Sequence, residues 1–253
     1  MKILLTNDDS FNSCLLPFAL EYLEGIGEVK TIVPLHEQSW KGKAMTRFGT
    51  RVIEERDVAG RVVQALDGTP ADCANVGIYH LFDGRPDLVV SGVNLGLNAG
   101  VAFLLSSGTV GGCLEANIAG LPGIALSQNL TSDLYVYYRR EHCLPPDVLI
   151  RLKEQTALLL PRIFDYLLKG QGLLDSALTW NVNLPYLAAE DTKLRLCSVS
   201  QSMYGSFFKH EEKGFSFGEL PMTLDMDPEN DWQVLEQGHV AISPIDISKI
   251  GRL

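Results

Sequence analysis

The sequence begins MKILLTNDDS at residues 1–10, an apolar stretch that ends abruptly in polar residues. The four residues ILLT, at positions 3–6, favour a β-strand, and their unbroken apolar character is typical of a strand buried in a parallel sheet. The polar stretch at residues 7–13 is expected to form a loop at the carboxyl end of this strand. The opening therefore predicts a buried strand with a polar loop at one edge of the sheet.

The next two segments alternate as a parallel sheet requires. Apolar residues recur at helical spacing from Leu15 to Leu23, and we expect Ser13 to cap this helix and Gly25 to end it. Residues 28–34 (EVKTIVP) favour a second strand. A strand, a helix and a second strand in this order predict a parallel sheet with crossover helices.

The same alternation continues to about residue 185. Thr69-Pro70 has the pattern of an N-cap followed by proline in the first helical turn. The expected elements are a helix from there to about residue 80, a strand at 87–91, a glycine-rich loop at 92–100, a helix at 109–119, a strand at 123–127 and a long helix at 147–169. We therefore predict that residues 1–185 form an α/β core with a doubly wound, mostly parallel sheet.

Residues 186–253 differ in character. Helical spacing fades, and the short β-prone pieces LRLCSVS, GSFFKHE and HVAISPI alternate with charged turns. Such pieces are typical of hairpins and extended arms, so we predict a C-terminal β-hairpin and arm that pair with another subunit. The charge clusters at 54–57 and 209–213 are expected to be solvated surface.

The composition narrows the function. Of the 253 residues, 46% are hydrophobic and 21% are charged, which is typical of a soluble globular protein with a large core. The formal net charge is −10, so most of the surface would repel a nucleic acid, and none is expected as a partner. A phosphorylated ligand would need a local attraction, from a metal ion or from backbone N–H groups.

The cysteines and the apolar runs bear on the location of the protein. The five cysteines form no CxxC pair and are odd in number, so neither a zinc site nor a complete set of disulfides is expected. The apolar stretch at the start is too short for a signal peptide, and no run is long enough to cross a membrane. We therefore expect a cytoplasmic protein.

Ligands of open parallel sheets bind beyond the carboxyl ends of the strands, and four polar loops, at 7–10, 37–39, 94–98 and 106–109, are expected to meet there. The adjacent carboxylates Asp8 and Asp9 would repel each other unless a cation offset their charge. Because the nearby candidate ligands are oxygen atoms, Mg²⁺ or Mn²⁺ is favoured over zinc. The alternative is that one aspartate caps the following helix and the other is solvated.

The segment SSGTVGG, at residues 106–112, places glycines and hydroxyls at an expected helix N-terminus. Free N–H groups and the helix dipole attract anions at such a position, and phosphate is a natural guest. The alternative is a simple N-cap at Ser107 or Thr109, with small residues that ease helix packing. The segment matches neither a Walker P-loop nor GxGxxG, so the sequence gives little support for an NAD- or FAD-binding site.

Taken together, these motifs resemble those of the SurE family of survival-protein nucleotidases, and the resemblance covers most of the chain. The motifs that carry it are TNDD (6–9), EQS (37–39) with Thr46, GTPADC (68–73), PDLVVSGVNLGLNAG (86–100), SGTVGG (107–112), GLPGIALS (120–127), NVNLP (181–185) and GHVAISPI (238–245). So many ordered matches are far more specific than any single motif.

The resemblance implies a function and a set of site residues. It implies metal-dependent hydrolysis of nucleoside 5′- or 3′-monophosphates, with one divalent metal ion per subunit. It also implies a Rossmann-like fold for residues 1–185, with a C-terminal arm that helps to build a homodimer or homotetramer. The implied metal ligands are Asp8, Asp9, Ser39 and Asn94, and the two aspartates are also the implied catalytic residues. The implied phosphate-binding residues are Asn94, Asn98, Ser107, Gly108 and Thr109.

Three positions depart from the family pattern. Ser10 follows the two acids where the family usually has glycine, Trp40 follows the EQS serine where glycine is common, and Ser106 precedes SGT where tyrosine is common. The metal ligands are kept while the walls of the substrate pocket change. A paralogue that binds but turns over weakly or not at all is therefore the alternative to an active phosphatase.

Two other classes of protein also place an acid after the first strand. A haloacid-dehalogenase-like phosphatase would use Asp8 as a covalent nucleophile, but it needs an Asp-x-Asp spacing that NDDS lacks. A response-regulator receiver is about half this length, and the chain shows no matching phosphoacceptor Asp and Lys pair. Neither class is favoured.

Overall fold

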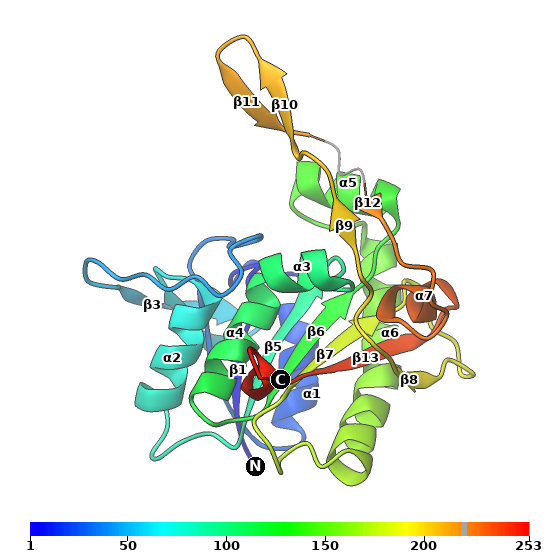
Figure 1. The fold of residues 1–253 in the computed structure, drawn as a ribbon. Coiled ribbons are helices and arrows are strands. Elements are labelled where there is room, and N and C mark those ends of the chain that lie inside the picture. The colour runs from blue at the N-terminus through cyan, green and yellow to red at the C-terminus, as the bar shows by residue number, and fades with distance from the viewer. Residues whose placement is uncertain (219–221, 253) are drawn as a thin grey trace.

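A mixed sheet forms the centre of the computed structural model, which describes residues 1–218 and 222–252 (Figure 1). Its strands, in spatial order, are β3 (Ile53–Val58), β4 (Arg61–Leu66), β2 (Glu28–Pro34), β1 (Lys2–Thr6), β5 (Leu88–Leu95), β6 (Gly123–Gln128), β7 (Thr179–Leu184), β13 (Val240–Ile245) and β8 (Leu194–Leu196). The strands from β4 to β7 in this order run parallel to one another, whereas β3, β13 and β8 run antiparallel to them. The predicted mostly parallel α/β fold is confirmed.

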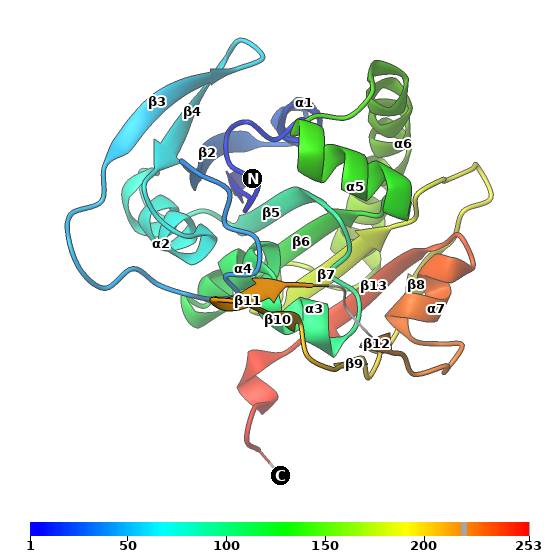
Figure 2. The same cartoon turned by 90° about the horizontal axis from the view of Figure 1, so that it is seen from above.

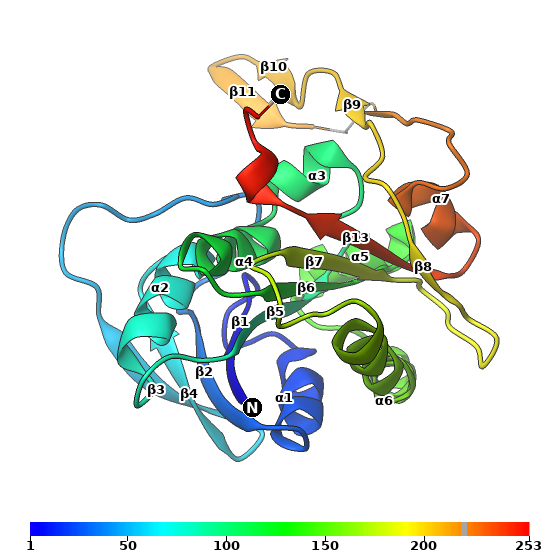
Figure 3. The same ribbon diagram turned by 60° about the horizontal axis from the view of Figure 1, so that its bottom comes forward.

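Helices cover both faces of the sheet, as the doubly wound prediction requires (Figure 3). Helices α1 (Leu16–Glu24) and α6 (Pro146–Asp165) lie on one face, and α2 (Pro70–His80) and α4 (Gly108–Ile118) lie on the other. The remaining helical segments are α3 (Val101–Ser106), α5 (Ser132–Glu141), the π-helical turn η1 (Tyr166–Gly170), α7 (Asp231–Glu236) and the 3₁₀ turn η2 (Ile247–Lys249).

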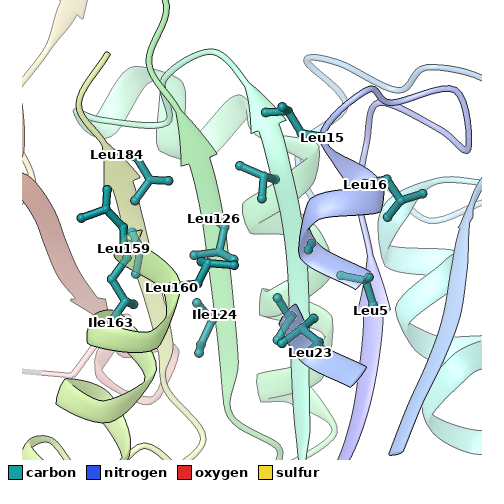
Figure 4. Close-up of a cluster of buried hydrophobic side chains, with 14 of the residues drawn as sticks. Leu5, Leu15, Leu16, Leu23, Ile124, Leu126, Leu159, Leu160, Ile163 and Leu184 are labelled. Atoms are coloured by element: carbon teal, nitrogen blue, oxygen red, sulfur yellow. The ribbon is translucent and has the colours of Figure 1, made fainter. Parts of the chain in front are cut away.

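The alternation of side chains along β1 divides the core into two layers. Ile3 and Leu5 face the layer beneath α1 and α6, and Leu4, between them, faces the layer beneath α2 and α4. Successive side chains of a strand point to opposite faces, so a strand that is apolar throughout serves both layers. Figure 4 shows the first layer, where leucines of α1 and α6 pack on β5, β6 and β7.

Of the two predicted N-caps, Thr69 and Ser13, the first is confirmed and the second is wrong. Thr69 caps α2 as expected, since its hydroxyl accepts from the Asp72 backbone N–H at 3.1 Å while the Asp72 carboxylate accepts from the Thr69 N–H at 2.9 Å. The expected cap at Ser13 is wrong, because α1 begins three residues later with Leu15 at the N-cap position and no side-chain cap. Pro17 explains the later start, because proline suits only the first turn of a helix.

The predicted loop at 92–100 is partly wrong. Strand β5 continues to Leu95, because after a register shift its backbone resumes pairing with β6 at Asn94 and Leu95. Glycine content alone suggested a loop, but pairing with a central neighbour overrides the weak strand preference of glycine. The longer strand brings Asn94 to the carboxyl end of the sheet.

The C-terminal region contributes to both the sheet and an arm. Strands β8 and β13 from this region join the central sheet. The pair β10 (Phe208–Glu211) and β11 (Gly214–Phe217) forms a hairpin that projects from the body, and β9 (Met203–Tyr204) pairs with β12 (Met222–Thr223) at its base (Figure 1). No helix within residues 1–218 or 222–252 is both long and apolar enough to cross a membrane.

Candidate functional site

The order of the strands creates a crevice between β1 and β5. The chain runs from β1 through α1 to β2 on one side of β1, and later places β5 and then β6 on the other side. The loops after β1 and β5 therefore diverge, and ligands of open α/β sheets bind at such a switch point. Seen from above, α3 and α5 lie on either side of the ends of β5 and β6 (Figure 2).

A cavity of about 580 Å³ opens at this point. Five of the residues implied by the sequence line it: Asp8, Ser39, Asn94, Asn98 and Ser107. The other three predicted residues, Asp9, Gly108 and Thr109, lie next to this lining. Gly108 and Thr109 contact Asp8, and Asp9 contacts the backbone of Leu95. All four polar loops therefore meet in one crevice, as the sequence predicts.

Asp8 is held in place by the start of α4. Only 3% of its surface is exposed, and its Oδ1 accepts a hydrogen bond of 2.6 Å from the Thr109 hydroxyl. Gly108 packs so closely that a Cβ there would lie 2.8 Å from the Asp8 Cβ and 3.1 Å from the Gln38 carbonyl oxygen. The backbone is fixed as well, since the Gln38 N–H donates to the Asp8 carbonyl at 2.8 Å.

Asp9 faces the end of β5. It is 6% exposed, and its Oδ2 accepts from the Leu95 N–H at 3.1 Å. Burial raises the pKa of both acids, and the negative charge of Asp8 raises the pKa of Asp9 further, although the Thr109 hydroxyl acts in the opposite direction on Asp8. Two adjacent buried carboxylates with raised pKa values are the electrostatic environment that a divalent cation relieves.

The donor set fits a hard divalent ion. One oxygen of each aspartate accepts from the protein, and the second can serve as a ligand. The Asn94 amide donates to the Gly96 carbonyl at 3.2 Å, which leaves its Oδ1 as a candidate ligand, and the Ser39 hydroxyl lies 2.7 Å from Glu37 at the rim. Oxygen ligands of this kind suit Mg²⁺ or Mn²⁺. Across the described ranges, 1–218 and 222–252, no group of three or more His, Cys, Asp or Glu residues offers another metal site.

Asn98 is fixed by a buried polar network on the neighbouring strands. Its N–H donates to Asn183 Oδ1 at 2.9 Å, its side-chain amide donates to the Ser127 hydroxyl at 2.7 Å, and its carbonyl accepts from the Asn181 amide at 2.8 Å. These contacts come from β6 and β7. Asn98 therefore lines the cavity with a fixed backbone and a fixed rotamer.

The hydroxyls at the start of α4 are engaged within the protein. The Ser107 side chain caps the helix by accepting from the Val110 N–H at 3.1 Å, as the simpler of the two interpretations of this segment expects. The Thr109 hydroxyl points to Asp8 and Thr109 is fully buried. What the start of α4 offers an anion is therefore its first backbone N–H groups rather than the Thr109 hydroxyl.

The sequence did not predict most of the apolar wall of the cavity. The wall includes the aromatic residues Trp40, Phe103, Tyr135, Tyr186 and Trp232. Phe103 lies on α3, Tyr135 on α5 and Trp232 on α7, three short helices that the sequence pattern did not reveal. Trp40 alone was visible, as a departure from the family pattern.

Comparison with known proteins places this arrangement in a family. The family described as "Survival protein SurE" matches residues 3–206. A protein of Methanosarcina mazei named 5'-nucleotidase SurE is 30% identical over 262 residues, covering 100% of this chain and 94% of that protein. A protein of Brevibacillus brevis with the same name is 33% identical over 261 residues, covering 100% of this chain and 92% of that protein.

A solved structure agrees with this placement at the level of the fold. The crystal structure of the SurE protein from Aquifex aeolicus superposes with a TM-score of 0.73 at 23% identity, covering 100% of this chain and 97% of that chain. The family match spans both acids, the EQS loop, the end of β5 and the start of α4. With the crevice built from those same segments, the chain belongs to the SurE family.

Proposed function

We propose that the protein is a divalent-metal-dependent phosphatase that hydrolyses phosphate monoesters, in the first place nucleoside 5′- or 3′-monophosphates. The observation that carries the proposal is the buried pair Asp8 and Asp9 at the inner end of a 580 Å³ cavity, beside the N-terminus of α4. The pair can hold a cation, and the helix can hold an anion. The names of the relatives, 5'-nucleotidase SurE, support the same reaction class.

Asp8, Asp9, Ser39 and Asn94 would hold one Mg²⁺ or Mn²⁺ ion per subunit. Such an ion, when bound, lowers the pKa of a coordinated water and offsets the charge that develops during phosphoryl transfer. Thr109 keeps the Asp8 carboxylate oriented, and the Leu95 N–H does the same for Asp9. These fixed contacts reduce the reorganisation that the ligands need.

The remaining site residues would bind and orient the substrate. The Gly108 N–H, at the start of α4, would bind the phosphate, and Ser107 fixes the start of this helix. Thr109 would act there through Asp8, which both its hydroxyl and its backbone N–H contact. Asn98, which also lines the cavity, would supply a further orienting contact. A net charge of −10 repels free anions at long range, so these local groups provide the attraction.

Turnover across a panel of phosphate monoesters tests this proposal. With Mg²⁺ or Mn²⁺ the protein should hydrolyse nucleoside monophosphates, and a chelator should abolish the activity because the two acids alone supply no electrophile. The measurement is phosphate release from the panel, with each metal and with chelator. Metal-dependent binding of a nucleotide without release would instead identify a binding-only paralogue, and metal-independent hydrolysis would contradict the mechanism.

The assembly and the location extend the proposal. We expect a homodimer or homotetramer in the cytoplasm, built with the hairpin β10–β11. The hairpin projects from the body and exposes Phe208, Phe215 and Phe217 by 57%, 69% and 57% (Figure 1). Exposed apolar groups gathered on one projecting element are typical of an interface.

Light scattering tests the assembly. The intact protein should give the mass of two or four chains at micromolar concentration, because burial of the hairpin phenylalanines against a second subunit stabilises the assembly. Replacement of Phe208 and Phe215 by serine should shift the mass toward the monomer while the α/β core stays folded, since neither residue belongs to the buried core. An intact protein that is monomeric at this concentration contradicts the predicted role of the arm.

A further inference from the structure

Trp40 has a backbone conformation that is unusual for a large residue. It directly follows Ser39, and its φ is 64°, in the left-handed region that normally favours glycine. A bulky side chain is rare there because its Cβ crowds the backbone. Its side chain is 38% exposed, so burial in the core does not account for the residue. Strained backbone that persists beside a site is a reason to ask what the side chain does there.

The Trp40 ring lies between the crevice and the hairpin. On one side its centroid is 5.8 Å from that of Phe103, which stacks in turn on Trp232 at 6.1 Å. On the other side it is 5.5 Å from the ring of Phe207, which precedes β10, and 5.7 Å from that of Phe217, the last residue of β11, both at the base of the hairpin. All of these Trp40 contacts are edge-to-face, the arrangement that aromatic pairs favour.

The same ring lines the cavity that holds the metal ligands. Trp40, Phe103 and Trp232 line this cavity together with Asp8 and Ser107, and the three rings are called its aromatic wall. A cavity of about 580 Å³ is in the range that encloses a small organic ligand. A phosphate held beside Asp8 would therefore have the aromatic wall in the same cavity as its leaving group.

We propose that Trp40 determines the specificity of this crevice for phosphate monoesters whose leaving group carries a flat ring, and that Phe207 and Phe217 of the hairpin position it. The proposal rests on the proposed phosphatase function and names the residues that select its substrate. A flat ring gains from stacking on an aromatic wall, whereas an aliphatic leaving group gains less. The hairpin, which is remote in sequence from the acids, thereby becomes part of the substrate site.

Selectivity between two substrates measures the role of Trp40. The ratio of kcat/KM for adenosine 5′-monophosphate to that for glycerol 2-phosphate should fall roughly 10- to 100-fold in Trp40→Gly, mainly through KM. Glycine is the suitable replacement because it adopts a φ of 64° without strain while it removes the ring. Trp40→Phe, which keeps an aromatic ring, should retain most of the ratio.

A matched pair of hairpin variants tests the positioning role. Phe217→Ala should lower the same ratio by a few-fold because Phe217 contacts Trp40. Phe215 lies on the same strand, but its ring packs on His210 and not on Trp40. Phe215→Ala should therefore leave the ratio unchanged. Equal effects of the two variants, or an unchanged ratio in Trp40→Gly, would overturn the proposal. Light scattering on each variant separates these effects from a change of assembly.

Binding of adenosine, which has no phosphate, provides a readout that does not depend on turnover. Calorimetric titration should show adenosine binding to the wild type, and binding at least 10-fold weaker to Trp40→Gly. If no monoester is hydrolysed, the proposed function fails, yet this titration still decides the role of Trp40. Equal adenosine affinity in wild type and Trp40→Gly would refute it.

Discussion

Asp8→Asn should remove the stabilisation of the protein by Mn²⁺. At a hundredfold excess over its dissociation constant, a ligand that binds only the folded state adds about 2.7 kcal/mol to the free energy of unfolding. For a domain of this size that corresponds to a rise in Tm of roughly 5–10 °C. The wild type should show this rise, and the variant should not, because asparagine supplies only one neutral oxygen in place of the carboxylate. Phosphatase activity should fall to background in the same variant.

Without metal, the order of stabilities should reverse. The asparagine that replaces Asp8 can still accept the hydrogen bond from Thr109, and the repulsion between positions 8 and 9 is gone, so the metal-free variant should melt at the same temperature as the wild type or higher. The raised pKa values of Asp8 and Asp9 give this a dependence on pH. Acids with a raised folded-state pKa stabilise the fold at low pH, and that contribution is lost as the pH rises through the raised values.

The stability of the metal-free wild type should therefore fall as the pH rises above the ordinary aspartate pKa. The loss should be smaller in Asp8→Asn, where the charge of residue 8 no longer raises the pKa of Asp9. Mn²⁺ competes with protons for the two carboxylates, so the stabilisation by Mn²⁺ should grow over the same pH range. Melting curves with Mn²⁺ and with chelator, at a series of pH values, measure both effects.

Asp72→Asn is the matched control. Asp72 is also a buried aspartate, but hydrogen bonds from the Thr46 side chain and from the Thr69 and Thr46 N–H groups outweigh its burial and lower its pKa. Its replacement by asparagine should lower the Tm, but the rise in Tm on addition of Mn²⁺ should be the same as in the wild type. A wild type whose Tm ignores Mn²⁺, or an Asp8→Asn variant that keeps the full Mn²⁺ effect, would contradict the metal site.

The parts of the fold that could be predicted from the sequence are those with strong local patterns. Strand β1 and helix α2 are examples, because an unbroken apolar run and a Thr-Pro cap each specify one structure. The hairpin β3–β4 could not be predicted, since the cluster Glu54–Asp57 belongs to an edge strand whose side chains alternate between exposed and half-buried. Charged side chains on an edge strand prevent pairing with another chain. They also replace the apolar alternation from which the strand could be predicted.

In the candidate site too, some features could be predicted from the sequence and others could not. The polar loops were predictable because the carboxyl ends of parallel strands meet at one edge, whatever the details of the fold. The direction of each side chain was not predictable. Ser107 caps α4, and the Thr109 hydroxyl donates to Asp8. The walls from α3, α5 and α7 depend on tertiary contacts, and α5 has no fully buried residue from which a core-facing pattern could be read.

The departures from the family pattern acquire a structural meaning. Ser10 and Trp40 stand where the family commonly has glycine, and both keep a positive φ, 70° and 64°. The loops therefore retain a glycine-like backbone, and what changes is the side chain presented. Ser106, where a tyrosine is common, presents only a small hydroxyl to the cavity, and Trp40 supplies an aromatic ring to the lining of the same cavity.

Thr109→Val should weaken Mn²⁺ binding 10- to 100-fold, the usual effect of losing a group that orients a metal ligand. Valine is close in shape to threonine but cannot donate to Asp8 Oδ1, so the buried carboxylate loses its 2.6 Å hydrogen bond. Because that bond lowers the pKa of Asp8, its loss should raise the pKa further, and protons should compete better with the metal. Activity at limiting Mn²⁺ should therefore fall, most strongly at low pH.

A titration of kcat against Mn²⁺ concentration separates this role from direct contact with phosphate. If Thr109 orients Asp8, saturating Mn²⁺ should restore much of the turnover, and Thr109→Ser, which keeps the hydroxyl, should resemble the wild type. If the hydroxyl instead binds the phosphate, the Mn²⁺ affinity should stay unchanged while kcat falls about 10²- to 10³-fold at every Mn²⁺ concentration. Unchanged kinetics in Thr109→Val would exclude both roles, and the 2.6 Å contact would then serve only the packing of α4 against β1.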